Sequence, residues 1–231
     1  MIDFHTHILP NMDDGPKSVE TSLELLNLLE KQDVKLVCLT SHFYANKESI
    51  DEFITRRNEA FKLLDYKGNL ELRLGAEVHY YPGISENKDI EKLCLQDSNI
   101  LLLELPFETS INEIMMKEMI VLLKKGIRVM LAHIERYDID EKTIRDLKNN
   151  GVLIQANCEF ILQTFFNKGL SWLKGGYIDV LGTDCHDLDK RKPNYLLAAN
   201  KIKKKLGENV FNIFMENSDK ILMLWGNFYF A

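Results

Sequence analysis

Histidine and carboxylate side chains recur in this sequence at the ends of short apolar runs or in the turns that follow them. The first run covers residues 2–6 and contains His5, and His7 follows two residues later. Because alternate residues of a strand face the same side, both imidazoles are expected on one face. Later runs and turns supply the other candidate ligands, which are Asp14, His42, Glu77, Glu104, His133, Asp184 and His186. Of the six histidines, only His79 lies outside this pattern.

Five imidazoles and four carboxylates are more than one tetrahedral zinc ion needs. They indicate two or three ions held by mixed nitrogen and oxygen ligands, with a carboxylate that bridges two ions. Such ligands favour Mn²⁺, Fe or Zn²⁺ over Ca²⁺. Clustered divalent ions activate water and hold the oxygens of a displacement at phosphorus. Taken singly, each residue could instead be a satisfied core histidine or a helix cap.

Two arginines follow candidate ligands closely. Arg136 comes three residues after His133, and Arg191 comes five residues after His186. A guanidinium group can hold two phosphate oxygens in a fork. Three divalent ions would outweigh the four carboxylates, so the site would attract an anion. The alternative for each arginine is a surface ion pair.

Apolar runs alternate with amphipathic stretches along the chain. Strands are predicted at residues 2–6, 35–40, 70–77, 99–104, 127–132, 152–155 and 177–181. Helices are predicted after the N-cap Ser18, at about 47–64, 112–125, 140–149 and 159–173, and from 193 to about 225. This alternation predicts a single α/β domain over residues 1–231, either a parallel barrel or a doubly wound sheet. Barrel enzymes build their sites at the carboxyl ends of the strands, where the candidate ligands are.

The composition of the chain limits the classes of molecule that the protein is expected to bind. A net charge of −6 argues against a nucleic-acid-binding surface. No apolar run approaches the ~20 residues that span a bilayer, and no signal peptide is recognisable. The four cysteines show no paired spacing, so we expect a reduced, cytoplasmic setting without membrane insertion. Lysines on the last helices, including Lys201 and Lys203 to Lys205, are more simply explained as a solvated face than as a binding patch.

The assembled motifs resemble those of the PHP (polymerase and histidinol phosphatase) superfamily. The similarity is greatest to the manganese-dependent tyrosine phosphatases of bacterial capsule and exopolysaccharide operons, and it extends over nearly the whole chain. It is carried by the motifs His5-Thr6-His7, Asp13-Asp14-Gly15-Pro16, Thr40-Ser41-His42, Gly75-Ala76-Glu77, Leu103-Glu104, His133-Ile134-Glu135-Arg136-Tyr137 and Thr183-Asp184-Cys185-His186. The resemblance implies a distorted (β/α)7 TIM-like barrel that holds three metal ions, most often Mn²⁺.

The resemblance also implies residue roles. His5, His7, Glu77 and Asp184 would hold one ion; Glu77, Glu104 and His133 a second; and Asp14, His42 and His186 the third. Hydrolysis would use a metal-activated hydroxide without a phosphoenzyme, and Arg136 and Arg191 would bind phosphate. His42 or Asp187 would protonate the leaving phenolate, a choice that the sequence leaves open. The implied substrate is the tyrosine-rich tail of a membrane-associated tyrosine autokinase.

Three other functions are weighed against this one. Cys185 and Arg191 have the C-x5-R spacing of cysteine-dependent tyrosine phosphatases, but the loop between them carries two acids and no glycine. A small-molecule phosphomonoesterase such as histidinol phosphatase would need the same metal site. A metal-stabilised binding module without turnover is the non-enzymatic alternative. The oligomeric state is not readable from the sequence, and an oligomer remains open.

Overall fold

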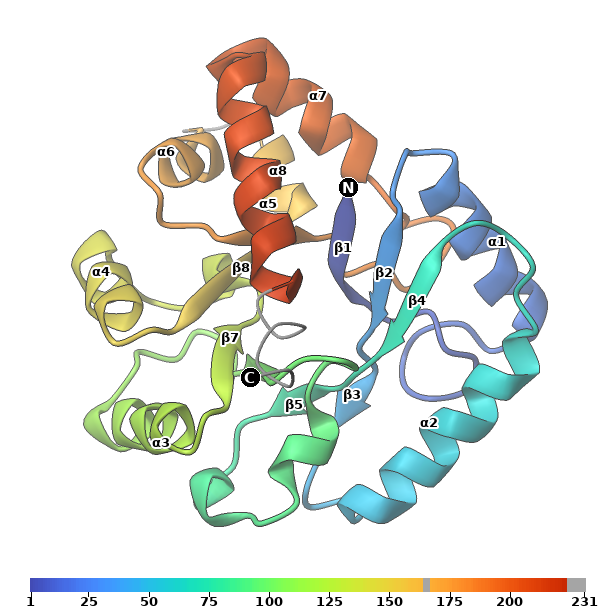
Figure 1. Cartoon of the computed structure of the whole chain (residues 1–231), viewed down its shortest axis with the longest axis horizontal. Coiled ribbons are helices and arrows are strands. Elements are labelled where there is room, and N and C mark those ends of the chain that lie inside the picture. The colour runs from blue at the N-terminus through green and yellow to red at the C-terminus, as the bar shows by residue number, and fades with distance from the viewer. Residues whose placement is uncertain (164–166, 224–231) are drawn as a thin grey trace, which may run out of the picture.

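Parallel strands curl into a barrel in the computed structural model, which describes residues 1–163 and 167–223 (Figure 1). In these ranges the strands are β1 Ile2–Thr6, β2 Leu36–Leu39, β3 His42–Phe43, β4 Glu71–Leu74, β5 Glu77–His79, β6 Ile100–Glu104, β7 Arg128–Leu131, β8 Leu153–Asn157 and β9 Val180–Gly182. One sheet has the order β1-β2-β4 and the other β3-β5-β6-β7-β8-β9, with every pairing parallel.

The two sheets form one barrel because two strands run from one sheet into the other, each with a short break. β2 continues into β3 after Thr40 and Ser41, and β4 continues into β5 after Gly75 and Ala76. At the opposite seam, a parallel bridge joins Thr6 of β1 to Cys185, just after β9. The chain therefore has seven strand positions within the described residues, and the predicted (β/α)7 TIM-like barrel is confirmed.

Burial on both faces explains why the strands are apolar throughout. On β6, Leu101 and Leu103 belong to the large core between strands and helices, whereas Ile100 and Leu102 belong to a smaller inner core. Phe4 and Met130 from other strands complete that inner core, and all of these side chains are fully buried. An alternating strand in a closed barrel buries both of its faces in this way.

Helices surround the strands (Figure 1). They are α1 Val19–Glu30, α2 Ile50–Leu64, α3 Glu113–Lys124, α4 Glu141–Asn149, α5 Cys158–Leu162, α6 Lys168–Lys174, α7 Tyr195–Leu206 and α8 Glu208–Met223, with short 3-10 turns η1 Ile84–Glu86, η2 Ile90–Leu93 and η3 Ile134–Arg136. Ser18 caps α1 as predicted by accepting a hydrogen bond from the Thr21 backbone N–H. Ser49 and Glu52 form a capping box, so α2 begins later than predicted.

Several predicted elements are wrong in their boundaries, among them the strand expected at 177–181, which is β9 at Val180–Gly182. The helix expected at 159–173 consists of α5 and α6, and α6 follows Asn167 in the left-handed conformation. The strand expected at 70–77 breaks at Gly75, where a Cβ would lie 2.6 Å from Leu95 Cδ2. Glu77 therefore begins β5 instead of ending a strand, and its backbone N–H faces the Thr40 and Ser41 carbonyls. Trp225, expected in the last helices, lies outside the described residues.

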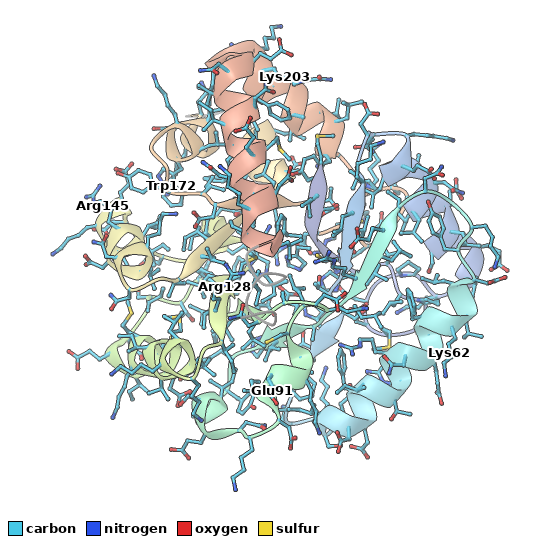
Figure 2. All side chains as sticks on the ribbon, in the orientation of Figure 1. Lys62, Glu91, Arg128, Arg145, Trp172 and Lys203 are labelled. Atoms are coloured by element: carbon cyan, nitrogen blue, oxygen red, sulfur yellow. The ribbon has the colours of Figure 1, made fainter. Side chains whose placement is uncertain are left out.

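Most charged side chains of the helices are on the outer surface; the buried Arg57 of α2, which donates to the Gly75 carbonyl, is an exception. Figure 2 shows Lys62 of α2 and Lys203 of α7 at the periphery, away from the strands. Lys203, Lys204 and Lys205 are exposed, whereas Ile202 beside them is fully buried. This arrangement is the solvated helix face expected from the sequence. Among the described residues, no helix is long and apolar enough to cross a membrane.

Candidate metal centre

The candidate ligands meet at one end of the barrel. His5 Nε2 and His7 Nε2 lie 3.0 Å apart, and both face the same oxygen, Glu77 Oε2, at 3.3 and 3.1 Å. Asp184 Oδ1 lies 3.6 Å from His5 Nε2 and 3.5 Å from His7 Nε2. The structure thus brings together the four residues expected around the first ion, from β1, β5 and the turn after β9.

Glu77 also contacts a second group. His133 Nε2 lies 2.8 Å from Glu77 Oε1 and 3.3 Å from Glu104 Oε1. His42 Nδ1 approaches the same two carboxylates, at 2.9 Å from Glu77 Oε2 and 3.7 Å from Glu104 Oε2. A buried carboxylate with one oxygen toward each group has the geometry of a bridging ligand.

A third group lies at the more open side. His186 Nε2 is 3.1 Å and His42 Nε2 is 3.7 Å from Asp14 Oδ1. The rings of His7 and His186 stack at 4.0 Å. His7, Asp14, His42 and His186 each offer a donor atom within 4.8 Å of the others. His42 and His7 therefore each touch two groups, which the residue-by-residue assignment from sequence did not anticipate.

The tautomers of the first two histidines leave their Nε2 lone pairs free. His5 Nδ1 lies 3.2 Å from Gln155 Oε1, which also accepts the His133 backbone N–H. His7 Nδ1 donates to Asp13 Oδ2 at 2.8 Å. With protons on both Nδ1 atoms, two Nε2 lone pairs face each other and Glu77 Oε2. This contact is repulsive unless a cation lies between them, so the residues fit a metal ion.

Unpartnered atoms support the same conclusion. His42 Nδ1 and His186 Nε2 are buried and make no hydrogen bond within the described residues, although carboxylate oxygens lie 2.9 and 3.1 Å away. In His186 the other nitrogen, Nδ1, faces the Asp184 backbone carbonyl at 2.9 Å. The free nitrogens and the carboxylate oxygens thus converge without pairing, as ligands of a shared cation do.

Protonation compensates for the carboxylates when no cation is present. Burial alone would lower the pKa of His133, but its hydrogen bonds to Glu104 and Glu77 raise it to about 9. Burial would raise the pKa of Glu77, yet the charge of His5 and the hydrogen bond from His133 hold it well below its usual range. Cations that bind here would take the place of these protons.

The backbone is strained at two candidate ligands. His133 has φ 30° and Asp184 has φ 53°, both in the left-handed region. Such conformations cost about 1–3 kcal/mol each and persist where surrounding contacts enforce them. Close approach of β1 and β9 is one such contact, because a Cβ on Gly182 would lie 2.5 Å from His5 Cβ.

Both arginines predicted to bind phosphate hold Asp184. Arg136 Nη2 donates to Asp184 Oδ2 at 2.5 Å, and Arg191 Nη2 donates to Asp184 Oδ1 at 2.7 Å. Their side chains are about one-third exposed. They line a cavity of about 810 Å³ that opens beside the ligand cluster.

Asp187 belongs to the turn that carries Arg191. Its Oδ1 accepts the backbone N–H groups of Asp189 at 2.8 Å and Arg191 at 3.0 Å. Slight burial favours the neutral form, but these hydrogen bonds lower the pKa of Asp187. An ionised carboxylate that accepts two backbone hydrogen bonds positions Arg191 and is a poor proton donor.

Sequence reasoning missed several supporting residues. Asn157 Nδ2 donates to Asp184 Oδ2 at 2.9 Å, and Gln155 Nε2 donates to Asn157 Oδ1 at 3.0 Å. His79 Nδ1 lies 3.1 Å from Glu104 Oε2. Asp3 accepts hydrogen bonds from the backbone and hydroxyl of Thr183, and burial raises its pKa to about 7. Polar residues within otherwise apolar strands were the available signal.

The cysteine-dependent alternative does not fit the geometry. The Cys185 side chain is fully buried, and burial raises the pKa of its thiol well above the usual value. A nucleophilic cysteine needs a lowered pKa and access to substrate. Cys185 instead belongs to the bridge between β1 and the end of β9.

The fold and the site define a structural class: parallel α/β barrels with a cluster of candidate metal ligands at one end. The fold matches a chain from the crystal structures of YwqE from Bacillus subtilis and CpsB from Streptococcus pneumoniae, described as unique metal-dependent tyrosine phosphatases. The TM-score is 0.81 with 22% identity, and the match covers 96% of this chain and 94% of that chain. The phosphotriesterase homology protein from Escherichia coli matches with TM-score 0.60 and 11% identity over 96% of this chain and 98% of that chain.

Comparison with known sequences identifies the family to which the chain belongs. It belongs to the CpsB/CapC family of capsular polysaccharide synthesis, whose model matches residues 1–223. The tyrosine-protein phosphatase CpsB of Streptococcus pneumoniae is 33% identical over an alignment of 243 positions that covers 96% of this chain and 98% of that protein. The family resemblance inferred from the motifs is confirmed.

Proposed function

We propose that this protein is a metal-dependent protein-tyrosine phosphatase that hydrolyses phosphotyrosine in a protein substrate. The observation that carries the proposal is the cluster of converging imidazoles and carboxylates beside a cavity lined by Arg136 and Arg191. Family membership supports it, because the relative from Streptococcus pneumoniae is named a tyrosine-protein phosphatase over almost the same length.

The proposal includes three divalent ions, with Mn²⁺ as the expected metal and Fe or Zn²⁺ as alternatives. His5, His7, Glu77 and Asp184 would hold one ion, and Glu104 and His133 would share Glu77 around the second. Asp14, His42 and His186 would hold the third. Bound ions supply Lewis acidity and activate water, which is the chemistry that phosphomonoester hydrolysis requires.

The residues around the ligands have separate roles in this proposal. Arg136 and Arg191 bind phosphate oxygens from the cavity side and orient the monoester, with Asp184 fixing their guanidinium groups. Asp187 holds the turn before Arg191. Because Asp187 has this structural role, His42 is the better candidate for the proton donor to the leaving phenolate. Its side chain is 14% exposed.

We further propose that the substrate is the tyrosine-rich tail of a membrane-associated tyrosine autokinase that regulates capsule or exopolysaccharide synthesis. The CpsB/CapC family assignment supports the capsule setting. The reaction would take place in the cytoplasm, where Cys38, Cys94, Cys158 and Cys185, all free and buried, stay reduced.

A side-by-side assay tests the activity. Phosphotyrosine peptide, p-nitrophenyl phosphate and histidinol phosphate are compared with Mn²⁺ and after EDTA treatment, and Glu77→Gln serves as the inactive control. We expect Mn²⁺-dependent hydrolysis of the phosphotyrosine peptide that the variant lacks. A strong preference for histidinol phosphate would favour the small-molecule phosphatase. Metal binding without hydrolysis of any substrate would favour the binding module.

A further inference from the structure

One large aromatic side chain is exposed at the cavity beside the metal centre. Phe107 is 71% exposed, the highest value among the large exposed hydrophobic residues of the described ranges. It lines the same cavity as Arg136 and Arg191. An exposed aromatic ring at the edge of a cavity is available to pack against an apolar part of a ligand.

Backbone hydrogen bonds hold the segment around Phe107 against the turn that carries Arg136. The Leu105 N–H donates to Tyr137 Oη at 2.9 Å, and the Glu108 N–H donates to the Arg136 carbonyl at 3.2 Å. The Asp138 N–H donates in return to the Thr109 carbonyl at 3.3 Å. The backbone on either side of Phe107 is therefore held against the turn that carries Arg136.

The other aromatic rings of the cavity are not available to a ligand. Tyr137 and Phe160 also line it, but they are only 6% and 5% exposed. The Tyr137 hydroxyl contacts Leu105 and His133, and the Phe160 ring packs edge-on against Trp172. Among the described lining residues, Phe107 is the aromatic side chain with a free face.

The remaining exposed apolar residues do not line this cavity. Leu63, Ile114, Leu197 and Ile213 lie elsewhere on the described surface. Exposure at Phe107 is thus combined with two arginines and a ligand cluster, whereas none of these four residues lines that cavity. A monoester with an aromatic alcohol has both an anionic and an apolar end that match this combination.

We propose that Phe107 is a specificity-determining residue that packs against the aromatic ring of the substrate while Arg136 and Arg191 hold its phosphate. This inference rests on the proposed phosphatase function and adds the group that selects an aryl ester. It assigns ring recognition to the β6–α3 connection, between Glu104 and Glu113.

Binding of two phosphonates separates ring recognition from phosphate recognition. Benzylphosphonate and methylphosphonate carry the same anionic group, and only the first carries a ring. Isothermal titration calorimetry on the Mn²⁺-loaded protein measures both dissociation constants. We expect Phe107→Ala to weaken benzylphosphonate binding about three- to tenfold and to leave methylphosphonate within about twofold. Phe107→Trp keeps an aromatic face and should restore benzylphosphonate binding.

Ile114→Ala is the matched control, because Ile114 is 65% exposed on the neighbouring helix and does not line the cavity. It should change neither dissociation constant. Unchanged benzylphosphonate binding in Phe107→Ala would overturn the inference. Equal weakening of both phosphonates would overturn it too, because a ring contact cannot weaken a ligand without a ring.

Hydrolysis by the wild-type protein keeps this result separate from the proposed function. If phosphotyrosine peptide is hydrolysed but benzylphosphonate binding does not depend on Phe107, the ring site is refuted and the phosphatase function stands. If no phosphotyrosine peptide is hydrolysed but benzylphosphonate binding still depends on Phe107, the ring site stands and the phosphatase function is refuted.

Discussion

Gln155 controls two elements of the metal centre although it is not a candidate ligand. Its side chain is fully buried on β8, and Oε1 accepts the His133 backbone N–H at 2.6 Å and faces His5 Nδ1 at 3.2 Å. Gln155→Leu keeps the approximate size and removes this acceptor. Each buried donor left without a partner costs about 1–3 kcal/mol, so the free energy of unfolding should fall by about 2–6 kcal/mol.

The same substitution should weaken metal binding. Gln155 fixes the proton of His5 on Nδ1 and so keeps the Nε2 lone pair toward Glu77. Loss of a residue that orients a ligand histidine reduces metal affinity by about 10- to 100-fold. Urea denaturation in EDTA measures the stability of the metal-free protein, and calorimetric titration with Mn²⁺ measures the affinity.

Gln32→Leu is a matched control. The Gln32 side chain is part-buried and likewise hydrogen-bonded on both sides of its amide: it donates to the Pro193 carbonyl and accepts the Leu196 N–H, both at 3.0 Å and outside the candidate metal centre. Gln32→Leu should therefore be less stable than the wild-type protein but bind Mn²⁺ with the same affinity. Gln155→Glu retains the acceptor and should bind Mn²⁺ more tightly than Gln155→Leu. The reasoning is refuted if Gln155→Leu binds Mn²⁺ within about threefold of wild type.

Three further predictions test the barrel seam and the mechanism. Asp3 has a pKa of about 7 in the folded protein and about 4 in the unfolded chain. Between these pH values the folded protein binds more protons at this carboxyl, so the contribution of Asp3 to the free energy of unfolding falls by about 4 kcal/mol as pH rises from 4 to 7. Asp3→Asn can keep the Thr183 contacts, and urea denaturation in EDTA should show a flatter pH dependence and higher stability at pH 8. Gly182→Ala puts a Cβ 2.5 Å from His5 Cβ and should cost about 1–3 kcal/mol in thermal denaturation, with weaker Mn²⁺ binding. Cys185→Ala should keep phosphatase activity that EDTA abolishes; loss of activity in a folded, Mn²⁺-loaded variant would contradict a metal-based mechanism.

Much of the candidate cluster was predictable because one rule governs several of its members. Parallel strands of a barrel present their carboxyl ends on one side, so polar residues that end apolar runs must meet there. That rule placed His5, Glu104 and His133 near each other without any knowledge of register. A separate pattern predicted the N-cap Ser18, which precedes an apolar helical stretch.

What the sequence did not predict depends on contacts between distant residues. Gly75 breaks the strand before Glu77 because Leu95, twenty positions later, packs where a Cβ would be. The contacts of Gln155 with His5 and His133 depend on strand neighbours that only the closed barrel defines. Phe107 carried no signal in the sequence, because exposure at a cavity is a property of the folded surface.

Closure of the barrel and assembly of the site are one structural event. β1 carries His5, and the turn after β9 carries Asp184 and His186, so the first group forms only when the two ends of the barrel meet. Three contacts make that seam: the Thr6–Cys185 bridge, the hydrogen bonds from Thr183 to Asp3, and the close approach at Gly182. The left-handed Asp184 lies within this seam, between Thr183 and Cys185, and its backbone N–H donates to the His5 carbonyl at 2.8 Å. The strained backbone of Asp184 is thus maintained by the hydrogen bonds that close the barrel. A cation bound by residues of both β1 and the turn after β9 would in turn stabilise the closed barrel.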